Sequence, residues 1–230
     1  MQPIVKYPRT PHIHGSRLQP GDEDLLMVAM ESLQDLPLVV EEKVDGSNSG
    51  ISFDPEGNLL LQSRGHILSG GPRERQFDLF KRWASHHVAW FRQCLGSRYI
   101  LYGEWLFARH TIAYDQLPHY FLEFDVLDRE AGQFLSTERR RHMLAGGPVV
   151  SVPVLATGAK IQLSKHLGLS TCSTREAKEG LYLKHEENGQ VLGRYKYVQP
   201  AFRQTVEASG EHWMDRPIEP NMLRPGVNLF

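Results

Sequence analysis

The sequence contains little cysteine, almost no net charge and no long hydrophobic run. Two cysteines in 230 residues, Cys94 and Cys172, fit a reducing compartment better than a disulfide framework. Lys+Arg number 26 and Asp+Glu 27, so the overall charge does not indicate nucleic-acid binding, although a local basic groove remains compatible with it. No apolar run approaches the ~20 residues of a membrane-spanning helix, and no signal-peptide pattern opens the sequence. We therefore expect a cytoplasmic protein without a membrane partner.

The chain also lacks internal repeats, low-complexity tracts and a convincing linker. Its apolar content of 40% and charged content of 23% are those of an ordinary globular protein. We expect one α+β domain over residues 1–230, with an extended N-terminal extension at 1–21 and a proline-punctuated C-terminal tail at 200–230.

Hydrophobic periodicity and turn residues predict the elements of this domain. Strands are expected at 39–43, 50–53, 59–63, 99–107, 120–127, 149–155, 180–184 and 191–198. Helices are expected from Gly21 or Asp22 through Leu33, as one long amphipathic helix between Pro72 and Leu95, and over 137–144 and 160–167.

A lysine held between carboxylates ends the first of these strands, in the segment Glu41-Glu42-Lys43-Val44-Asp45-Gly46-Ser47-Asn48. Because Asp45-Gly46 is a turn signal, we expect Lys43 at the mouth of a hairpin formed with the following strand. A rigid strand end can aim an amine as a nucleophile rather than leave it as a surface charge.

Charged residues also interrupt the other apolar strands. Together with the first strand's lysine, the set is Lys43, Glu104, Asp125, Glu179 and Lys196. Such charges are costly in apolar surroundings unless they are paired or used, so we expect one shared polar site with both signs of charge. Cations that hold phosphate, carboxylates that hold a divalent ion and an aromatic face for a base suit a nucleotide.

The order of these segments resembles the covalent nucleotidyltransferases, the superfamily of ATP-dependent DNA and RNA ligases and mRNA capping enzymes. The segment from Glu41 to Asn48 is similar to motif I of the second class of phage-type RNA ligases. Later segments resemble the remaining motifs in order: Ser63-Arg64 the ribose-contacting arginine, Gly103-Glu104 motif III, Phe124-Asp125 motif IIIa, Glu179-Gly180-Leu181-Tyr182-Leu183-Lys184 motif IV, and Arg194-Tyr195-Lys196 motif V. The resemblance implies an ATP-grasp-like nucleotidyltransferase core of mostly antiparallel sheets flanked by helices. DNA ligases and capping enzymes with this core add an OB domain, but we expect none here, because only about thirty residues follow Lys196.

The resemblance also implies an activity, ATP-dependent RNA ligation in RNA repair. Lys43 would attack the α-phosphate of ATP to form a lysyl-AMP, the AMP would pass to a 5′-phosphate RNA end, and a 3′-hydroxyl would then displace it. Mg²⁺ or Mn²⁺, together with Lys184 and Lys196, would favour the neutral amine of Lys43. An end-healing kinase or phosphatase is the partner that such an enzyme suggests. A nick, a broken tRNA loop and a single-stranded end all fit as its substrate.

Roles for individual residues follow from the same resemblance. Phe124 would stack on adenine, with Glu42 at the base edge, and a divalent metal would be held by Glu104 and Glu179. The implied catalytic residues are Lys43, Glu179, Lys184 and Lys196. The implied ATP-binding residues are Glu42, Val44, Asn48, Arg64, Glu104, Phe124, Lys184, Arg194 and Lys196.

Other interpretations remain beside this one. The pattern also fits a minimal DNA ligase, an adenylyltransferase that stops after the first step, or a non-catalytic nucleic-acid-binding module. His12 and His14 resemble a metal pair, but two ligands make no site, so we expect loop histidines with one of them packed. The alternative is that the segment from Arg9 to Arg17 lines the active site and reads the RNA terminus or the pyrophosphate. Arg139-Arg140-Arg141 is expected to form a solvated helix face rather than an RNA contact. Trp83 and Phe91 are expected in the core.

Overall fold

The computed structural model describes residues 4–18, 21–202 and 217–230. Its strands belong to one mostly antiparallel sheet with the order β10-β3-β11-β12-β8-β7-β6-β4-β5, to which β1, β2 and β9 are added at the sides. The strands are β1 (His12–Ile13), β2 (Met27–Val28), β3 (Leu38–Lys43), β4 (Ser47–Phe53), β5 (Leu59–Ser63), β6 (Tyr99–Trp105), β7 (Phe121–Asp128), β8 (Gln133–Leu135), β9 (Val150–Ser151), β10 (Val154–Gly158), β11 (Gly180–Glu187) and β12 (Gln190–Val198). The helices are α1 (Asp78–His86), α2 (Val88–Leu95) and α3 (Thr137–Leu144), with 3-10 turns η1 (Met30–Ser32), η2 (Pro72–Phe77) and η3 (Leu163–His166). The expected α+β class is confirmed.

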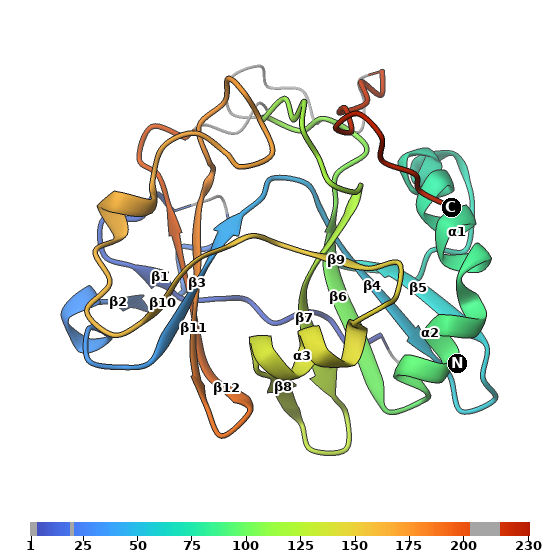
Figure 1. Ribbon diagram of the computed structural model, residues 1–230, viewed down its shortest axis with the longest axis horizontal. Helices are drawn as coiled ribbons and strands as arrows, with labels where there is room; N and C mark the ends of the chain where they lie inside the picture. The colour runs from blue at the N-terminus through green and yellow to red at the C-terminus, as the bar shows by residue number, and fades with distance from the viewer. Residues whose placement is uncertain (1–3, 19–20, 203–216) are drawn as a thin grey trace.

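The short strand β8 joins two halves of this sheet. One half contains β10, β3, β11 and β12, and the other contains β7, β6, β4 and β5; Figure 1 shows them on the left and right of the molecule, with α1 and α2 along the outer side of the right half. Lys184 Nζ of β11 lies 2.8 Å from Glu41 Oε2 of β3 and 2.9 Å from Asp125 Oδ1 of β7. A buried ionic contact therefore connects the two halves.

The predicted arginine face of α3 is wrong for its central member. Arg140 is 0% exposed, its Nη1 donates to both carboxylate oxygens of Glu123 at 2.6 Å, and its Nη2 donates to Glu41. Its neighbours Arg139 and Arg141 are exposed, as expected. A buried guanidinium is tolerated here because carboxylates from β3 and β7 surround it.

The long amphipathic helix has the predicted buried face but is not continuous. His87, with φ −97° and ψ 16°, separates α1 from α2, and the first turns after Pro72 are 3-10. Trp83 and Phe91 are buried against the β4–β7 half, as predicted.

Two other helix predictions are wrong. Residues 22–33 contain only β2 and the single turn η1, because the carboxylate of Asp22 binds His12 and Lys196 instead of capping a helix. Residues 160–167 contain only η3, which has no side-chain cap at Gln162. The strand expected at 149–155 is divided into β9 and β10 around Pro153, which has no N–H for a ladder bond.

The predicted hairpin after Lys43 is also wrong. Strand β3 pairs with β10 and β11, whereas β4 pairs with β5 and β6. Residues 44–46 therefore carry the chain from one half of the sheet to the other. Gly46 suits this crossing, because a Cβ there would lie 2.7 Å from the carbonyl oxygen of Trp105.

The end of the chain packs against the long loop that follows β6. Ala108 bridges to Pro220 and Leu117 to Leu223, and the buried Asn221 donates to the carbonyl oxygen of Leu106 at 2.8 Å. The middle of the predicted tail, 203–216, lies outside the described residues. In the part of the chain that the structure describes, no helix has the length and apolarity to cross a membrane.

Candidate active site

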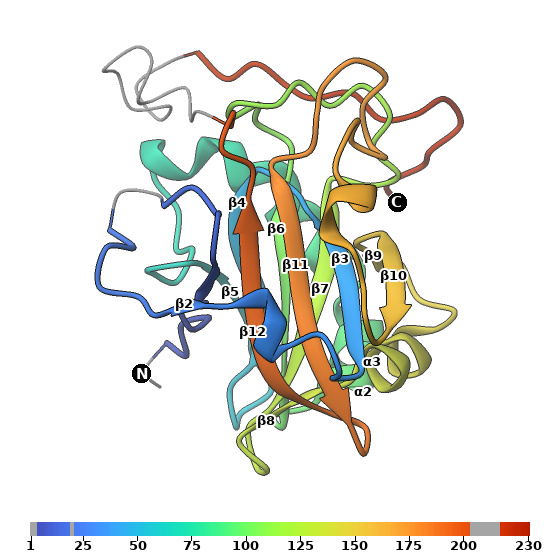
Figure 2. The same ribbon diagram turned by 90° about the vertical axis from the view of Figure 1, so that its left-hand side faces the viewer.

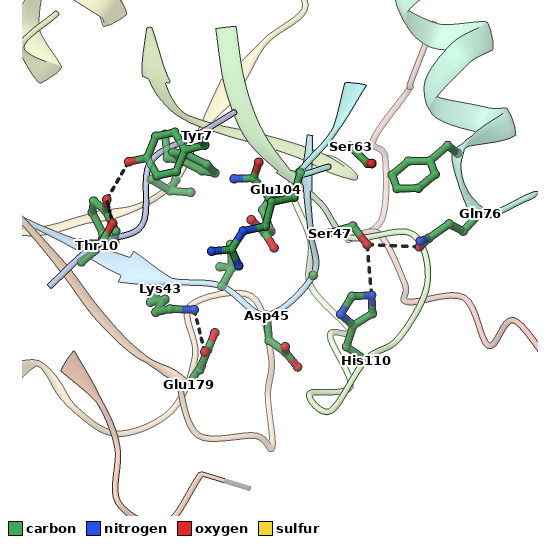
Figure 3. A pocket seen from close by; sticks show the side chains of 18 of the residues that line it. Tyr7, Thr10, Lys43, Asp45, Ser47, Ser63, Gln76, Glu104, His110 and Glu179 are labelled. Atoms are coloured by element: carbon green, nitrogen blue, oxygen red, sulfur yellow. Dashed lines mark hydrogen bonds and ion pairs between the residues drawn. The ribbon is translucent and has the colours of Figure 1, made fainter. Parts of the chain in front are cut away.

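A cavity of about 910 Å³ opens where the ends of β3, β4, β6 and β11 meet. Figure 3 shows Lys43, Asp45, Glu104 and Glu179 grouped around one space. The cavity wall contains nine of the residues to which the sequence assigns a role: Glu42, Lys43, Val44, Asn48, Arg64, Glu104, Phe124, Glu179 and Lys196. The charged strand ends thus meet in one cavity.

Strand pairing places the lysine beside its carboxylate partner. Gly180 is the register partner of Lys43 in the β3–β11 ladder, so Glu179 comes just before that pair, and its Oε1 lies 2.6 Å from Lys43 Nζ. The Lys43 side chain is 21% exposed. Burial alone would lower the pKa of Lys43, but the carboxylates of Glu179, Glu104 and Asp45 outweigh it and raise that pKa above its usual value. The amine is therefore held as an ammonium ion in this state.

The opposite wall is built by β4 and β6, whose register pairs Asn48 with Glu104. Burial raises the pKa of Glu104 to about 8, with Glu179 and Asp45 adding to the rise and Lys43 opposing it. The buried Oδ1 of Asn48 receives no hydrogen bond from the residues that the structure describes. A cation bound beside this wall would therefore favour the ionised form of Glu104. The Oδ1 of Asn48 is an acceptor to which a ligand can donate a hydrogen bond.

A second cation of the site, Lys196, comes from β12. Lys196 Nζ lies 2.5 Å from Asp22 Oδ2, and its side chain is 10% exposed. Burial lowers the pKa of Lys196, Asp22 opposes this, and Lys43 and Arg64 add to the lowering. Arg64, at the turn after β5, also lines the cavity.

The aromatic ring of Phe124 and the carboxylate of Glu42 line another part of the cavity wall. The ring of Phe124 lies 5.1 Å from that of Tyr7 in an edge-to-face arrangement. Glu42 is held from the side by the loop after η3, where Thr171 donates from N at 3.0 Å and from Oγ1 at 2.6 Å. The expected base-binding pair is therefore at one cavity, with the carboxylate already oriented.

The sequence and the fold of the chain were compared with those of known proteins. The family model described as RNA ligase matches residues 36–198. The chain belongs to the RNA ligase family. No curated protein matches. The chain is similar in fold to a Naegleria gruberi RNA ligase variant solved with ATP and Mn, at 18% identity and a TM-score of 0.55 over 75% of this chain and 52% of that one. It is similar as well to an archaeal ATP-dependent RNA ligase, at 17% identity and a TM-score of 0.60 over 85% of this chain and 48% of that one. The chain thus spans about half the length of these solved relatives.

Two of the expected site residues, Lys184 and Arg194, lie outside the cavity lining that the described residues form. Lys184 is buried between Glu41 and Asp125, and its expected effect on the amine of Lys43 stays a prediction. The Arg194 guanidinium lies over the ring of Phe134, 3.9 Å from its centroid, rather than in the cavity.

Several cavity residues were not predicted. Tyr7 comes from the N-terminal extension, just before the segment Arg9–Arg17, for which lining of the active site is an alternative; Arg9 and Thr10 of that segment do line the cavity. Ser47, Gln76 and His110 form a polar group, with Ser47 Oγ 3.4 Å from Gln76 Oε1 and 3.3 Å from His110 Nε2 (Figure 3). Only Ser47 had a signal, its place directly after Gly46.

The sequence places Asp45 at a turn within the segment that resembles motif I but assigns it no role in the site. Its buried Oδ2 accepts the N–H of Thr111 at 2.8 Å and that of Ile112 at 3.1 Å, which ties the loop after β6 to the end of β3. Its position in the Lys43–Gly46 motif was the signal that pointed to a larger role.

The two N-terminal histidines do not form a metal pair. His12 is fully buried and bonded to Asp22, whereas His14 is exposed. Among the described residues there is no group of three or more His, Cys, Asp or Glu side chains suited to a metal ion.

Proposed function

We propose that this chain is an ATP-dependent RNA ligase in which Lys43 is the nucleophile. Lys43 Nζ would bond to the α-phosphorus of ATP as the bond to pyrophosphate breaks, which gives a lysyl-AMP. The single observation that carries this proposal is the place of the amine: it lies in a cavity, 2.6 Å from Glu179, on a strand end within the matched RNA ligase region.

The ATP would lie along the wall described above. Phe124 would stack on adenine, Glu42 would bind the base edge, and Arg64 and Glu104 would hold the ribose. Lys196 would meet the α-phosphate, and Asn48 would contact phosphate or the adenylylated substrate. Val44 would pack beneath the nucleotide. Lys184 and Arg194 would act from behind the wall, since Lys184 Nζ donates to the carbonyl oxygen of Phe124.

The donor set also fits a divalent cation. Glu104 and Glu179 both act on the amine of Lys43, and Mg²⁺ is commonly bound by one or two carboxylates together with substrate phosphates. A Mg²⁺ or Mn²⁺ ion held there would neutralise phosphate charge. The solved relative from Naegleria gruberi was studied with ATP and Mn, which supports this cofactor set for the chain.

The amine must lose its proton before it can attack. Its pKa is raised chiefly by Glu179, so the proposal requires that this carboxylate act on another cation when the nucleotide is bound. The reaction would then continue by AMP transfer to a 5′-phosphate RNA end and sealing by a 3′-hydroxyl. An end-healing kinase or phosphatase is the partner we propose to supply such ends.

Intact-mass spectrometry after incubation with ATP and Mg²⁺ tests the proposal. We expect the chain to gain one AMP, mapped by peptide analysis to Lys43, and we expect Lys43→Ala to gain none. Lys165→Ala, a change at an exposed lysine, is the matched control and should gain AMP like the parent. AMP uptake by Lys43→Ala would reject the role of Lys43.

Sealing assays separate the ligase proposal from its alternatives. Nicked duplexes with RNA or DNA on the 3′-hydroxyl side distinguish an RNA ligase from a minimal DNA ligase. A chain that gains AMP but seals neither substrate would be an adenylyltransferase only.

A further inference from the structure

The N-terminal segment reaches the cavity wall from outside the region that matches the family. Strand β1 runs parallel to β12 with His12 as the register partner of Lys196, and the family match begins only at residue 36. The N–H of Lys196 donates to the carbonyl oxygen of Pro11 at 2.9 Å. Figure 2 shows this segment, in dark blue, lying beside β12.

Side chains extend this contact into a continuous hydrogen-bonded chain. Asp22 Oδ2 lies 2.5 Å from Lys196 Nζ and 3.0 Å from His12 Nε2. A carboxylate only accepts, so Nε2 of His12 donates, and Nδ1 of the neutral ring accepts from Ser16 Oγ at 2.7 Å. Ser16 Oγ in turn accepts the N–H of Val198 at 2.9 Å. Burial lowers the pKa of His12, which agrees with the neutral ring that this order of donors needs.

These three residue types also make hydrolytic triads, but this arrangement differs from a triad. His12 is 0% exposed, and the carboxylate that orients it is shared with a lysine. The member that reaches the cavity is Lys196, not Ser16. The series of hydrogen bonds from Ser16 through His12 and Asp22 therefore ends at Lys196.

A lysine in this position needs such support. Its ammonium ion sits on a flexible four-carbon stem that can adopt many directions. The charged groups that act on the Lys196 ammonium ion are Asp22, Lys43 and Arg64. Asp22 Oδ1 also lies 3.6 Å from Arg9 Nη2. Without Asp22, burial and two neighbouring cations would favour the neutral amine, which holds phosphate poorly.

We propose that Asp22 and His12 are positioning residues that fix the ammonium ion of Lys196 on the phosphate-binding wall of the cavity. The inference rests on the proposed function, and it assigns part of the site to a segment that lies before the matched region.

The pH dependence of AMP uptake in Asp22→Asn tests this role, because the exchange keeps the size of the side chain. We expect the rate ratio of parent to variant to grow about tenfold between pH 7 and pH 9, as the unsupported lysine loses its proton. Glu23→Gln is the matched control: Glu23 is exposed and accepts the N–H of its own loop at Gly21. A ratio for Asp22→Asn that stays constant with pH would overturn the inference, since a purely structural defect would give that result. If Asp22→Asn does not fold, Asp22→Ser replaces it, with the same direction expected, because it too removes the carboxylate beside Lys196.

A second measurement does not depend on enzyme activity. The pH dependence of Lys196 acylation by acetic anhydride, followed by peptide mass analysis, reports the protonation of that amine directly. In Asp22→Asn the reaction should begin at lower pH than in the parent. If the parent gains no AMP, the proposed function fails, while the acylation profile still decides whether Asp22 controls Lys196; identical profiles would reject the pair.

Discussion

The protonation of Lys43 shows how a single residue combines two requirements. An amine that is to be a nucleophile must be neutral, yet Glu179, Glu104 and Asp45 raise its pKa. The same carboxylates hold the side chain at the strand end, with Glu179 at 2.6 Å. The ligand-free site is thus organised around a charged lysine, and activation is expected to depend on what binds beside those carboxylates.

Glu104 gives a residue-scale prediction about stability. Its pKa rises from 4.5 to about 8 on folding, mainly through burial. The folded chain then binds the Glu104 proton more tightly than the unfolded chain, so this stabilising contribution is complete below pH 4.5 and is lost as the pH rises to about 8. Glu104→Gln cannot ionise and avoids the loss. We expect its unfolding free energy, relative to the parent, to increase between pH 5 and pH 8 in metal-free buffer.

Urea unfolding at several pH values measures this difference. Glu56→Gln, at an exposed turn position, serves as the control and should show a constant difference from the parent. A constant difference for Glu104→Gln as well would show that Glu104 is ionised throughout this range.

The contact of β11 with β12 gives a prediction at the scale of elements. A Cβ on Gly180 would lie 1.9 Å from the carbonyl oxygen of Tyr197, and main chain cannot move aside as a flexible side chain can. Gly180→Ala should therefore separate the two strands and shift Glu179 away from Lys43. We expect a destabilisation of about 1–3 kcal/mol, typical of overpacking, together with slower AMP uptake.

Gly65→Ala is the control for that change, because nothing lies within 4 Å of a Cβ there. Denaturant unfolding should give a midpoint close to the parent for Gly65→Ala and a lower one for Gly180→Ala. Equal midpoints for the two variants would mean that β11 and β12 have room to separate at no cost.

The elements also show which parts of the structure the sequence predicts. Strand positions were predictable because alternation and turn residues are local signals, and α3 was predicted at its observed bounds. Pairing was not predictable, because Asp45-Gly46 is locally a hairpin turn while β3 pairs with a strand more than a hundred residues away. Most cavity residues within the motifs are predicted from the sequence. Asp22 is instead expected as a helix cap, because its partner Lys196 is 174 residues away along the chain and no local pattern indicates the contact.

At the scale of the whole molecule, we expect stability and the shape of the cavity to depend on the contacts between the two half-sheets. In the order of paired strands the connection is the short β8, which pairs with β12 on one side and β7 on the other. Between the halves lie Glu41 from β3 and Glu123 from β7, and Arg140 binds both. Glu41 also lines the cavity, together with Lys43 of one half-sheet and Glu104 of the other. We therefore expect the distance between Lys43 and Glu104 to depend on this ionic contact between the half-sheets.

Arg140→Ala tests this ionic contact directly. It leaves two buried carboxylates without their guanidinium, and removal of one partner from a buried ion pair commonly costs ~3–5 kcal/mol. Arg139→Ala is the matched control from the same helix, since Arg139 is exposed and donates to the Gly189 carbonyl oxygen at 3.2 Å; it should cost less than ~1 kcal/mol. Because an unpaired carboxylate can be neutralised by protonation, the deficit of Arg140→Ala should shrink as the pH falls from 8 to 5. Equal unfolding free energies for the two variants would mean that the half-sheets stay together without the ionic contact, and apolar packing would then be what fixes the distance across the cavity.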